Sequence, residues 1–182
     1  SFPTRRSSDL FQMVEIAKTI FMHFGAHKTA STSIQNFLAR QEPNPDWRYI
    51  SLEDMKSRPF NLLHGICRRK YSTTTIKCYA SKMASAFNKI EQDEIIISNE
   101  NLLGQMPGVK SSFYPNVENL ALFLKELKKH FAVKGILFVR EQCSYLKSCY
   151  QFRVLKGSSL PIEEFIEQIL EGIPEKIPAP KP

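Results

Sequence analysis

Several features are scarce or missing in this sequence of 182 residues, and each absence narrows what the protein can be. The longest apolar runs, such as residues 135–139, fall far short of the ~18 residues that a membrane span needs. The first ten residues contain no apolar core of the kind found in a signal peptide. The four cysteines form no C-x-x-C pair and have no zinc-type spacing with a histidine. We therefore expect reduced thiols in a cytoplasmic protein with no membrane span and no metal site.

A basic stripe with interleaved aromatic residues, typical of nucleic-acid-binding proteins, is also missing. The net charge is nonetheless +7 and the pI is about 9.3, which favours anionic partners. Because 42% of the residues are apolar and 24% are charged, the chain can bury a core of its own. These values predict a globular protein that binds a small anionic ligand and no nucleic acid.

The two ends of the sequence differ in composition from the rest. Residues 1–10 show no periodicity and resemble a translated sequencing adapter, so we interpret them as non-native. Residues 173–182 contain four prolines and predict an extended tail. Residues 11–172 are expected to form one α/β domain that is incomplete at its C-terminal side.

Strand and helix patterns alternate along this domain. Short β-rich apolar runs predict strands at 18–25, 47–52, 95–98 and 133–139. Helical spacing of apolar residues predicts helices at 32–41, 60–69, 73–91, 116–131, 142–155 and 161–171. Because the strands are continuously apolar, we expect a parallel sheet with helices on both faces, a three-layer sandwich. Ligands bind at the carboxyl ends of the strands in such sheets.

The residues after the first predicted strand carry the strongest chemical signal. The run from Gly25 to Ser33 reads Gly-Ala-His-Lys-Thr-Ala-Ser-Thr-Ser and leads directly into a helix. The free N–H groups and the dipole of a helix start attract a phosphate group. Lys28 adds a positive charge, and Thr29, Ser31, Thr32 and Ser33 add hydroxyl donors. The segment therefore predicts a phosphate-binding loop.

This loop differs from the Walker A motif, which reads G-x-x-x-x-G-K-S/T. Here Lys28 comes three residues after Gly25 and is followed by Thr29 and Ala30. The strand at 133–139 ends in Val139-Arg140, where such an enzyme would place an acidic residue to hold magnesium. Both differences disfavour a magnesium-dependent phosphoryl transferase.

The loop from His27 to Ser33 resembles the 5′-phosphosulfate loop of the sulfotransferases that use 3′-phosphoadenosine 5′-phosphosulfate (PAPS), in particular bacterial members with H-K-T-G-T-T-S. Phe138-Val139-Arg140, with Ser148 eight residues further on, is similar to the 3′-phosphate site of the same family. The resemblance covers residues 18–157 and implies a P-loop NTPase-like fold. Ala30 stands where the family usually has glycine, and a positive φ there would cost ~1 kcal/mol.

The resemblance also implies a reaction, in which a sulfuryl group moves from PAPS to an acceptor hydroxyl or amine without a metal. Lys28 would stabilise the leaving 3′,5′-bisphosphate. Residues 28–33, Arg140 and Ser148 would bind the nucleotide, with Arg140 gripping the 3′-phosphate. The general base is expected to be Glu100, which follows the third predicted strand, with His64 as second candidate.

Other interpretations fit parts of the same pattern. A P-loop nucleotide kinase would use the same loop and sheet, and a truncated fragment would have no catalytic activity. The acceptor is not specified by the sequence, although a small molecule or a carbohydrate is the default expectation, and the oligomeric state is open. Of the remaining histidines, His27 is expected to orient the loop and His23 to lie in the core.

Overall fold

The computed structural model describes residues 18–66, 68–104, 106, 114 and 116–171. The segments predicted to be a non-native start and a proline-rich tail therefore lie outside the described residues, as does Cys67. Cys78, Cys143 and Cys149 are free thiols.

A four-stranded parallel sheet forms the centre of the described chain. Its strands are β1 (Thr19–Gly25), β2 (Trp47–Ile50), β3 (Glu94–Ser98) and β4 (Ala132–Phe138), in the order β2-β3-β1-β4. β1 pairs with β3 on one side and with β4 on the other, and all pairs are parallel. The carboxyl ends of β1, β3 and β4 consequently meet at one edge, which confirms the α/β class and the parallel sheet predicted from the sequence.

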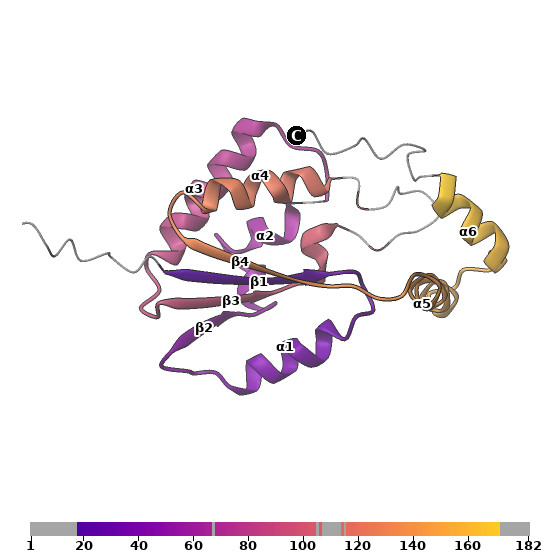
Figure 1. Cartoon of the computed structure of the whole chain (residues 1–182), viewed down its shortest axis with the longest axis horizontal. Coiled ribbons are helices and arrows are strands. Elements are labelled where there is room, and N and C mark those ends of the chain that lie inside the picture. Colours follow the sequence, from indigo (N-terminus) through magenta and orange to yellow (C-terminus); the bar gives the residue numbers. More distant parts are fainter. Residues whose placement is uncertain (1–17, 67, 105, 107–113, 115, 172–182) are drawn as a thin grey trace, which may run out of the picture.

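Helices cover both faces of this sheet (Figure 1). α1 (Ser31–Arg40) lies on one face, and α2 (Asn61–Gly65), α3 (Thr73–Phe87) and α4 (Val117–Leu127) lie on the other. Short 3₁₀ turns, η1 (Asp54–Lys56) and η2 (Glu100–Leu103), follow β2 and β3. This arrangement is consistent with the expected three-layer sandwich.

The main core lies between the sheet and the α3–α4 layer. Alternate residues of β1 and β3 supply one side of it, and fully buried side chains of α3 and α4 supply the other; they include Ile20, Met22, Ile95, Ile97, Met83, Phe87, Phe123 and Leu127. Full burial of one such side chain contributes about 1.5–3 kcal/mol to folding. This packing fixes the strands whose ends carry the polar residues described below.

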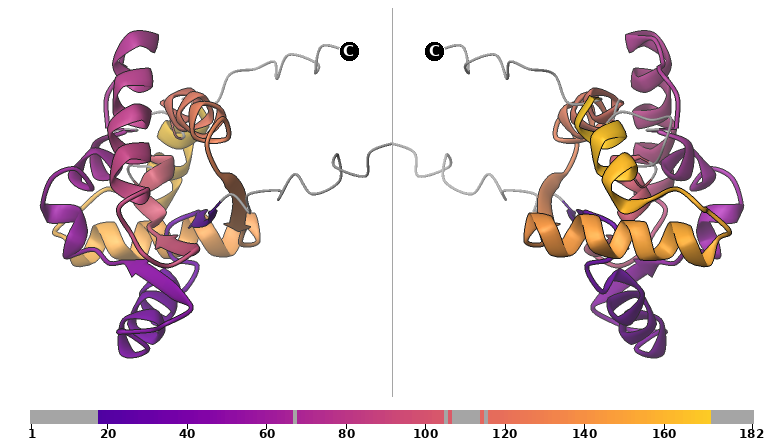
Figure 2. Two further views of the ribbon diagram at one scale, coloured as in Figure 1. Left: turned by 90° about the vertical axis from the view of Figure 1, so that its left-hand side faces the viewer. Right: turned by 90° about the vertical axis from the view of Figure 1, so that its right-hand side faces the viewer.

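α5 (Gln142–Leu155) and α6 (Ile162–Glu171) lie beyond the carboxyl ends of the strands, and α5 runs across that end of the sheet (Figures 1 and 2). Tyr145 and Cys149 of α5 pack against Phe165 and Ile169 of α6 in a second, smaller core. None of the helices in the described ranges has both the length and the apolarity to cross a membrane.

The predicted elements are all present, but several helices end earlier than their apolar patterns suggested. The pattern of α4 continues to Phe131, whereas the helix ends at Leu127. Phe131 is buried all the same, because the turn after Leu127 carries it back to the core. The apolar spacing thus predicted burial correctly and helix length too generously.

Candidate functional site

The loop between β1 and α1 is held in an unusual backbone conformation. Lys28 and Ala30 have φ angles of 67° and 65°, in the left-handed region that glycine prefers. The Thr29 hydroxyl donates a hydrogen bond to the carbonyl of Ala26 at 2.7 Å and so closes the turn. Ala30 is the N-cap of α1 and provides no side-chain cap. The helix therefore begins with backbone groups that a bound anion could engage.

The end of β4 lies directly against the end of β1. A Cβ atom on Gly25 would lie 2.5 Å from the carbonyl oxygen of Phe138, so only glycine permits this approach. The next residue, Ala26, donates its backbone N–H to the same oxygen at 3.2 Å. Arg140, two residues after Phe138, donates a hydrogen bond from Nη1 to the carbonyl oxygen of Lys28 at 3.1 Å. The loop and the residue after β4 thus meet at one point of the sheet edge.

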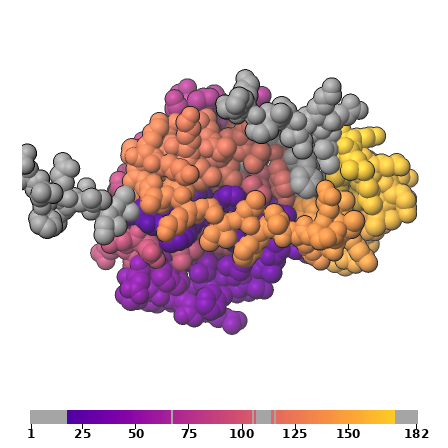
Figure 3. All heavy atoms as spheres, in the orientation of Figure 1, coloured from indigo at the N-terminus to yellow at the C-terminus, as the bar shows by residue number. Residues whose placement is uncertain are grey.

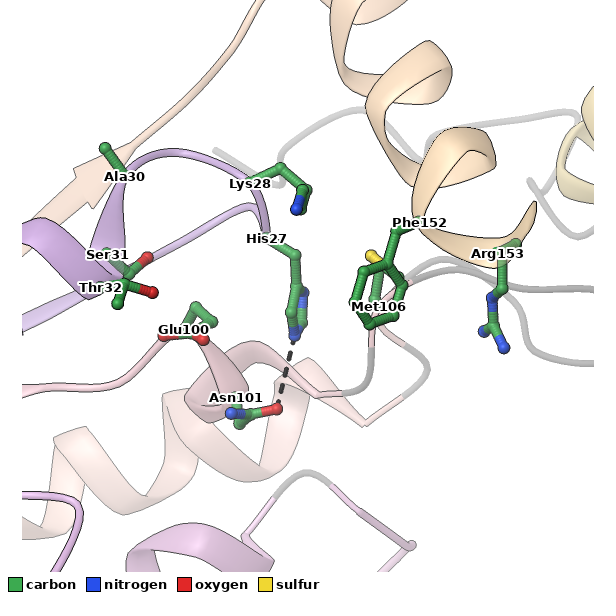
Figure 4. Close-up of a pocket in the computed structure, with 10 residues that line it drawn as sticks. All are labelled: His27, Lys28, Ala30, Ser31, Thr32, Glu100, Asn101, Met106, Phe152 and Arg153. Atoms are coloured by element: carbon green, nitrogen blue, oxygen red, sulfur yellow. Dashed lines mark hydrogen bonds between the residues drawn. The ribbon is translucent and has the colours of Figure 1, made fainter. Parts of the chain in front are cut away.

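A cavity of about 660 Å³ opens beside this point (Figure 4). The loop, the start of α1, η2, residue 106 and α5 line it with cationic, hydroxyl, carboxylate and apolar side chains: His27, Lys28, Ala30, Ser31, Thr32, Glu100, Asn101, Met106, Phe152 and Arg153. In Figure 4, Thr32 and Glu100 lie at one end of the group, His27, Lys28 and Asn101 in the middle, and Met106 and Phe152 between these and Arg153 at the other end. The cavity therefore offers different chemistry along its length.

Glu100 is positioned by a residue of α1. The Gln35 side chain donates from Nε2 to Glu100 Oε2 at 3.0 Å and to the Ser98 carbonyl at 3.1 Å. Gln35 itself is buried, with 7% of its surface exposed. A buried amide bonded in this way holds one carboxylate oxygen and leaves the other available to accept a proton.

Burial lowers the pKa of His27, against the opposing influences of its hydrogen bond to Asn101 and the nearby charge of Glu100. Its Nε2 lies 3.4 Å from Asn101 Oδ1, so this nitrogen carries the proton if the bond is made. The role of His27 in orienting the loop stays a prediction. His23 is buried in β1, as expected, with Nδ1 2.7 Å from the Ser98 hydroxyl.

Lys28 also meets an aromatic ring of α5. Its Nζ lies 5.3 Å from the centroid of Phe152, and Lys156 Nζ lies 5.6 Å from the same centroid. A cation over an aromatic ring gains about 0.5–2 kcal/mol, depending on how far it is desolvated. The ring therefore helps hold the Lys28 ammonium in place beside the cavity.

The structure gathers most, but not all, of the predicted site residues around the cavity. Lys28, Ala30, Ser31, Thr32 and Glu100 line it. The other predicted residues lie nearby without lining it: Thr29 closes the turn, Ser33 is on the exposed side of α1, Arg140 contacts the loop backbone, and Ser148 lies within α5. His64 lies on α2 and does not line the cavity either.

Sequence reasoning missed Gln35 and Arg153. Gln35 could have been found, because it lies one helical turn after Ser31 and Thr32 and so shares their face. Arg153 had only a weak signal, since its place at the cavity depends on how α5 crosses the sheet edge.

Comparisons with known proteins give no match to any protein-family model and none to a curated protein.

Proposed function

We propose that this protein is a PAPS-dependent sulfotransferase with a P-loop-like nucleotide-binding fold. The observation that carries the proposal is the hydrogen bond from Arg140 to the Lys28 carbonyl. It brings together, at one edge of the sheet, the two motifs that resemble the 5′-phosphosulfate loop and the 3′-phosphate site of the sulfotransferases. A nucleotide with a phosphate at each end of its ribose requires two anion-binding groups that are close but separate. The helix start of α1 and the guanidinium of Arg140 supply such a pair.

In the proposed reaction, the sulfur–oxygen bond to the 5′-phosphate breaks while the acceptor oxygen forms a new bond to the same sulfur. Glu100 takes the proton of the acceptor hydroxyl, and Lys28 stabilises the negative charge left on the 5′-phosphate oxygen. Support comes from the position of both side chains in one cavity. A carbohydrate is the proposed acceptor, and the proposed compartment is the cytoplasm, where exposed thiols such as Cys78 and Cys143 stay reduced.

Isothermal titration with 3′,5′-adenosine bisphosphate tests the proposal. We expect binding without magnesium, tighter than the binding of ATP with magnesium. Lys28→Ala should weaken it by about tenfold or more, because a charge-assisted contact contributes about 1.5–3 kcal/mol. Lys82→Ala is the matched control, since Lys82 is an exposed lysine on α3. Tighter binding of magnesium-ATP than of the bisphosphate would favour a nucleotide kinase instead.

A second candidate function, a non-catalytic fragment that binds the nucleotide, is suggested by the edge strand β4. The apolar side chains of Ile136, Leu137 and Phe138 on β4 are 41%, 54% and 40% exposed, and Figure 3 shows β4 at the surface. Contiguous exposed apolar surface is unusual in a completed domain. In this alternative the polypeptide binds the bisphosphate but transfers no sulfuryl group. Transfer of ³⁵S from labelled PAPS to a carbohydrate acceptor distinguishes the two candidates.

A further inference from the structure

Arg153 is the cation of the cavity that the proposed transfer chemistry does not use. It lies in the last turn of α5, is half-buried, and lines the cavity at the end away from Thr32 and Glu100 in Figure 4. Its Nε is buried and has no hydrogen-bond partner within the described ranges. A buried guanidinium nitrogen without a partner is costly, and an anion bound to the guanidinium in the cavity would offset part of that cost.

The charges around Arg153 point to an anion. No ion pair joins Arg153 to a carboxylate in the described part of the chain. Lys156 is one helical turn further on, with its ammonium over Phe152, the ring that also contacts Lys28. This end of the cavity therefore attracts negative charge, and the planar fork of arginine suits a carboxylate or sulfate.

The part of the cavity next to Arg153 is apolar. Met106 and Phe152 lie between His27 and Arg153 in Figure 4. An aromatic face and a thioether suit the C–H face of a sugar ring or the face of an aromatic ring. A ligand that fills the cavity would place a hydroxyl near Glu100, a ring against Phe152 and an acidic group at Arg153.

We propose that the acceptor is a ring compound with an acidic group, with a hexuronate sugar as the model, and that Arg153 selects it through that group. The part of this inference that makes the ligand the acceptor rests on the proposed function. The anion-binding role of Arg153 can be tested separately, because it predicts selective binding whether or not transfer occurs.

The experiment compares two probes that differ only in the acidic group, 4-nitrophenyl β-D-glucuronide and 4-nitrophenyl β-D-glucoside. Their affinities for the full chain are measured by isothermal titration, with and without saturating 3′,5′-adenosine bisphosphate. We expect the glucuronide to bind about tenfold or more tightly than the glucoside. Arg153→Met should abolish this preference, and Arg153→Lys should retain part of it because the charge remains without the fork. Lys147→Met, an exposed lysine on the same helix, should leave the preference within about twofold of the wild type.

The outcomes separate the two proposals. Equal affinity for the two glycosides, no measurable binding of either, or a preference that survives in Arg153→Met overturns the role of Arg153. Bisphosphate affinity is measured on each variant and should stay within about twofold, which also shows that the variant is folded. If the glucuronide preference is present and depends on Arg153 while the bisphosphate does not bind, the anion site stands and the sulfotransferase proposal fails.

Discussion

Ala30→Gly should make the protein more stable, although the same replacement inside a helix usually lowers stability. Ala30 has φ 65° and ψ 21° at the N-cap of α1, a left-handed conformation that costs an L-residue roughly 1–2 kcal/mol. Glycine removes this cost but gains freedom in the unfolded chain, which takes back about 0.4–1 kcal/mol. The free energy of unfolding should therefore rise by about 0.5–1 kcal/mol.

Urea denaturation followed by circular dichroism measures this change. With a urea m-value of ~2 kcal/mol/M, the expected gain moves the midpoint upward by about 0.3–0.5 M. Ala121→Gly provides a matched control, because Ala121 is exposed within α4 and the same replacement there should cost about 1 kcal/mol. The two variants carry the same chemical change and should move the midpoint in opposite directions.

A downward shift of the midpoint for Ala30→Gly, similar to that of Ala121→Gly, would refute the reasoning. It would mean that Ala30 has an ordinary helical or extended backbone in solution. The loop would then lack the turn that directs its backbone N–H groups toward a common ligand.

Three further variants test the loop and its supports. Gly25→Ala should lower the melting temperature, since the new Cβ would meet the Phe138 carbonyl and overpacking costs about 1–3 kcal/mol; an unchanged melting temperature would contradict the close strand approach. Glu141→Gln should lower the melting temperature at pH 7, because the carboxylate accepts two backbone N–H bonds at the start of α5, which lower the pKa of Glu141 to about 2. That stabilisation is complete above the ordinary pKa of 4.5 and is lost as pH falls toward 2, so the difference from wild type in thermal melts should shrink between these values; a constant difference would argue against it. Burial lowers the pKa of folded His27 below 6.5, so the unfolded chain takes up the proton first and the free energy of unfolding decreases as the pH is lowered from about 7 to 5.5. In urea titrations, His27→Gln should make this decrease smaller. Equal slopes for His27→Gln and wild type would show that His27 titrates alike in both states.

The sequence was sufficient to predict the sheet edge because the signals there are local. The apolar run of β1 and the small, hydroxylated residues after Gly25 predict a strand, a turn and a helix start without reference to the rest of the chain. The strand ending before Arg140 was equally visible. Parallel pairing then requires these strand ends to share an edge, which is the arrangement that the structure has.

The contacts within the site were less predictable because they depend on tertiary packing. Glu100 was expected near the edge, but its partner Gln35 comes from α1, which lies 65 residues away in the chain. The predicted role of Ser148 is not tested by its position within α5. The side of α5 that faces the cavity depends on its rotation about its own axis, and no local pattern specifies that rotation.

The rotation of α5 follows from its contact with α6. Tyr145 and Cys149 are buried against Phe165 and Ile169, and this contact fixes the rotation of α5 about its own axis. Phe152 and Arg153 follow Cys149 at helical spacings of three and four, so they lie around the same part of the helix. A change in the α5–α6 core would therefore move the apolar ring and the guanidinium together. Ala26 of the loop after β1 packs against the same core, and Lys28 contacts the Phe152 ring, so such a change would also reach the proposed bisphosphate site.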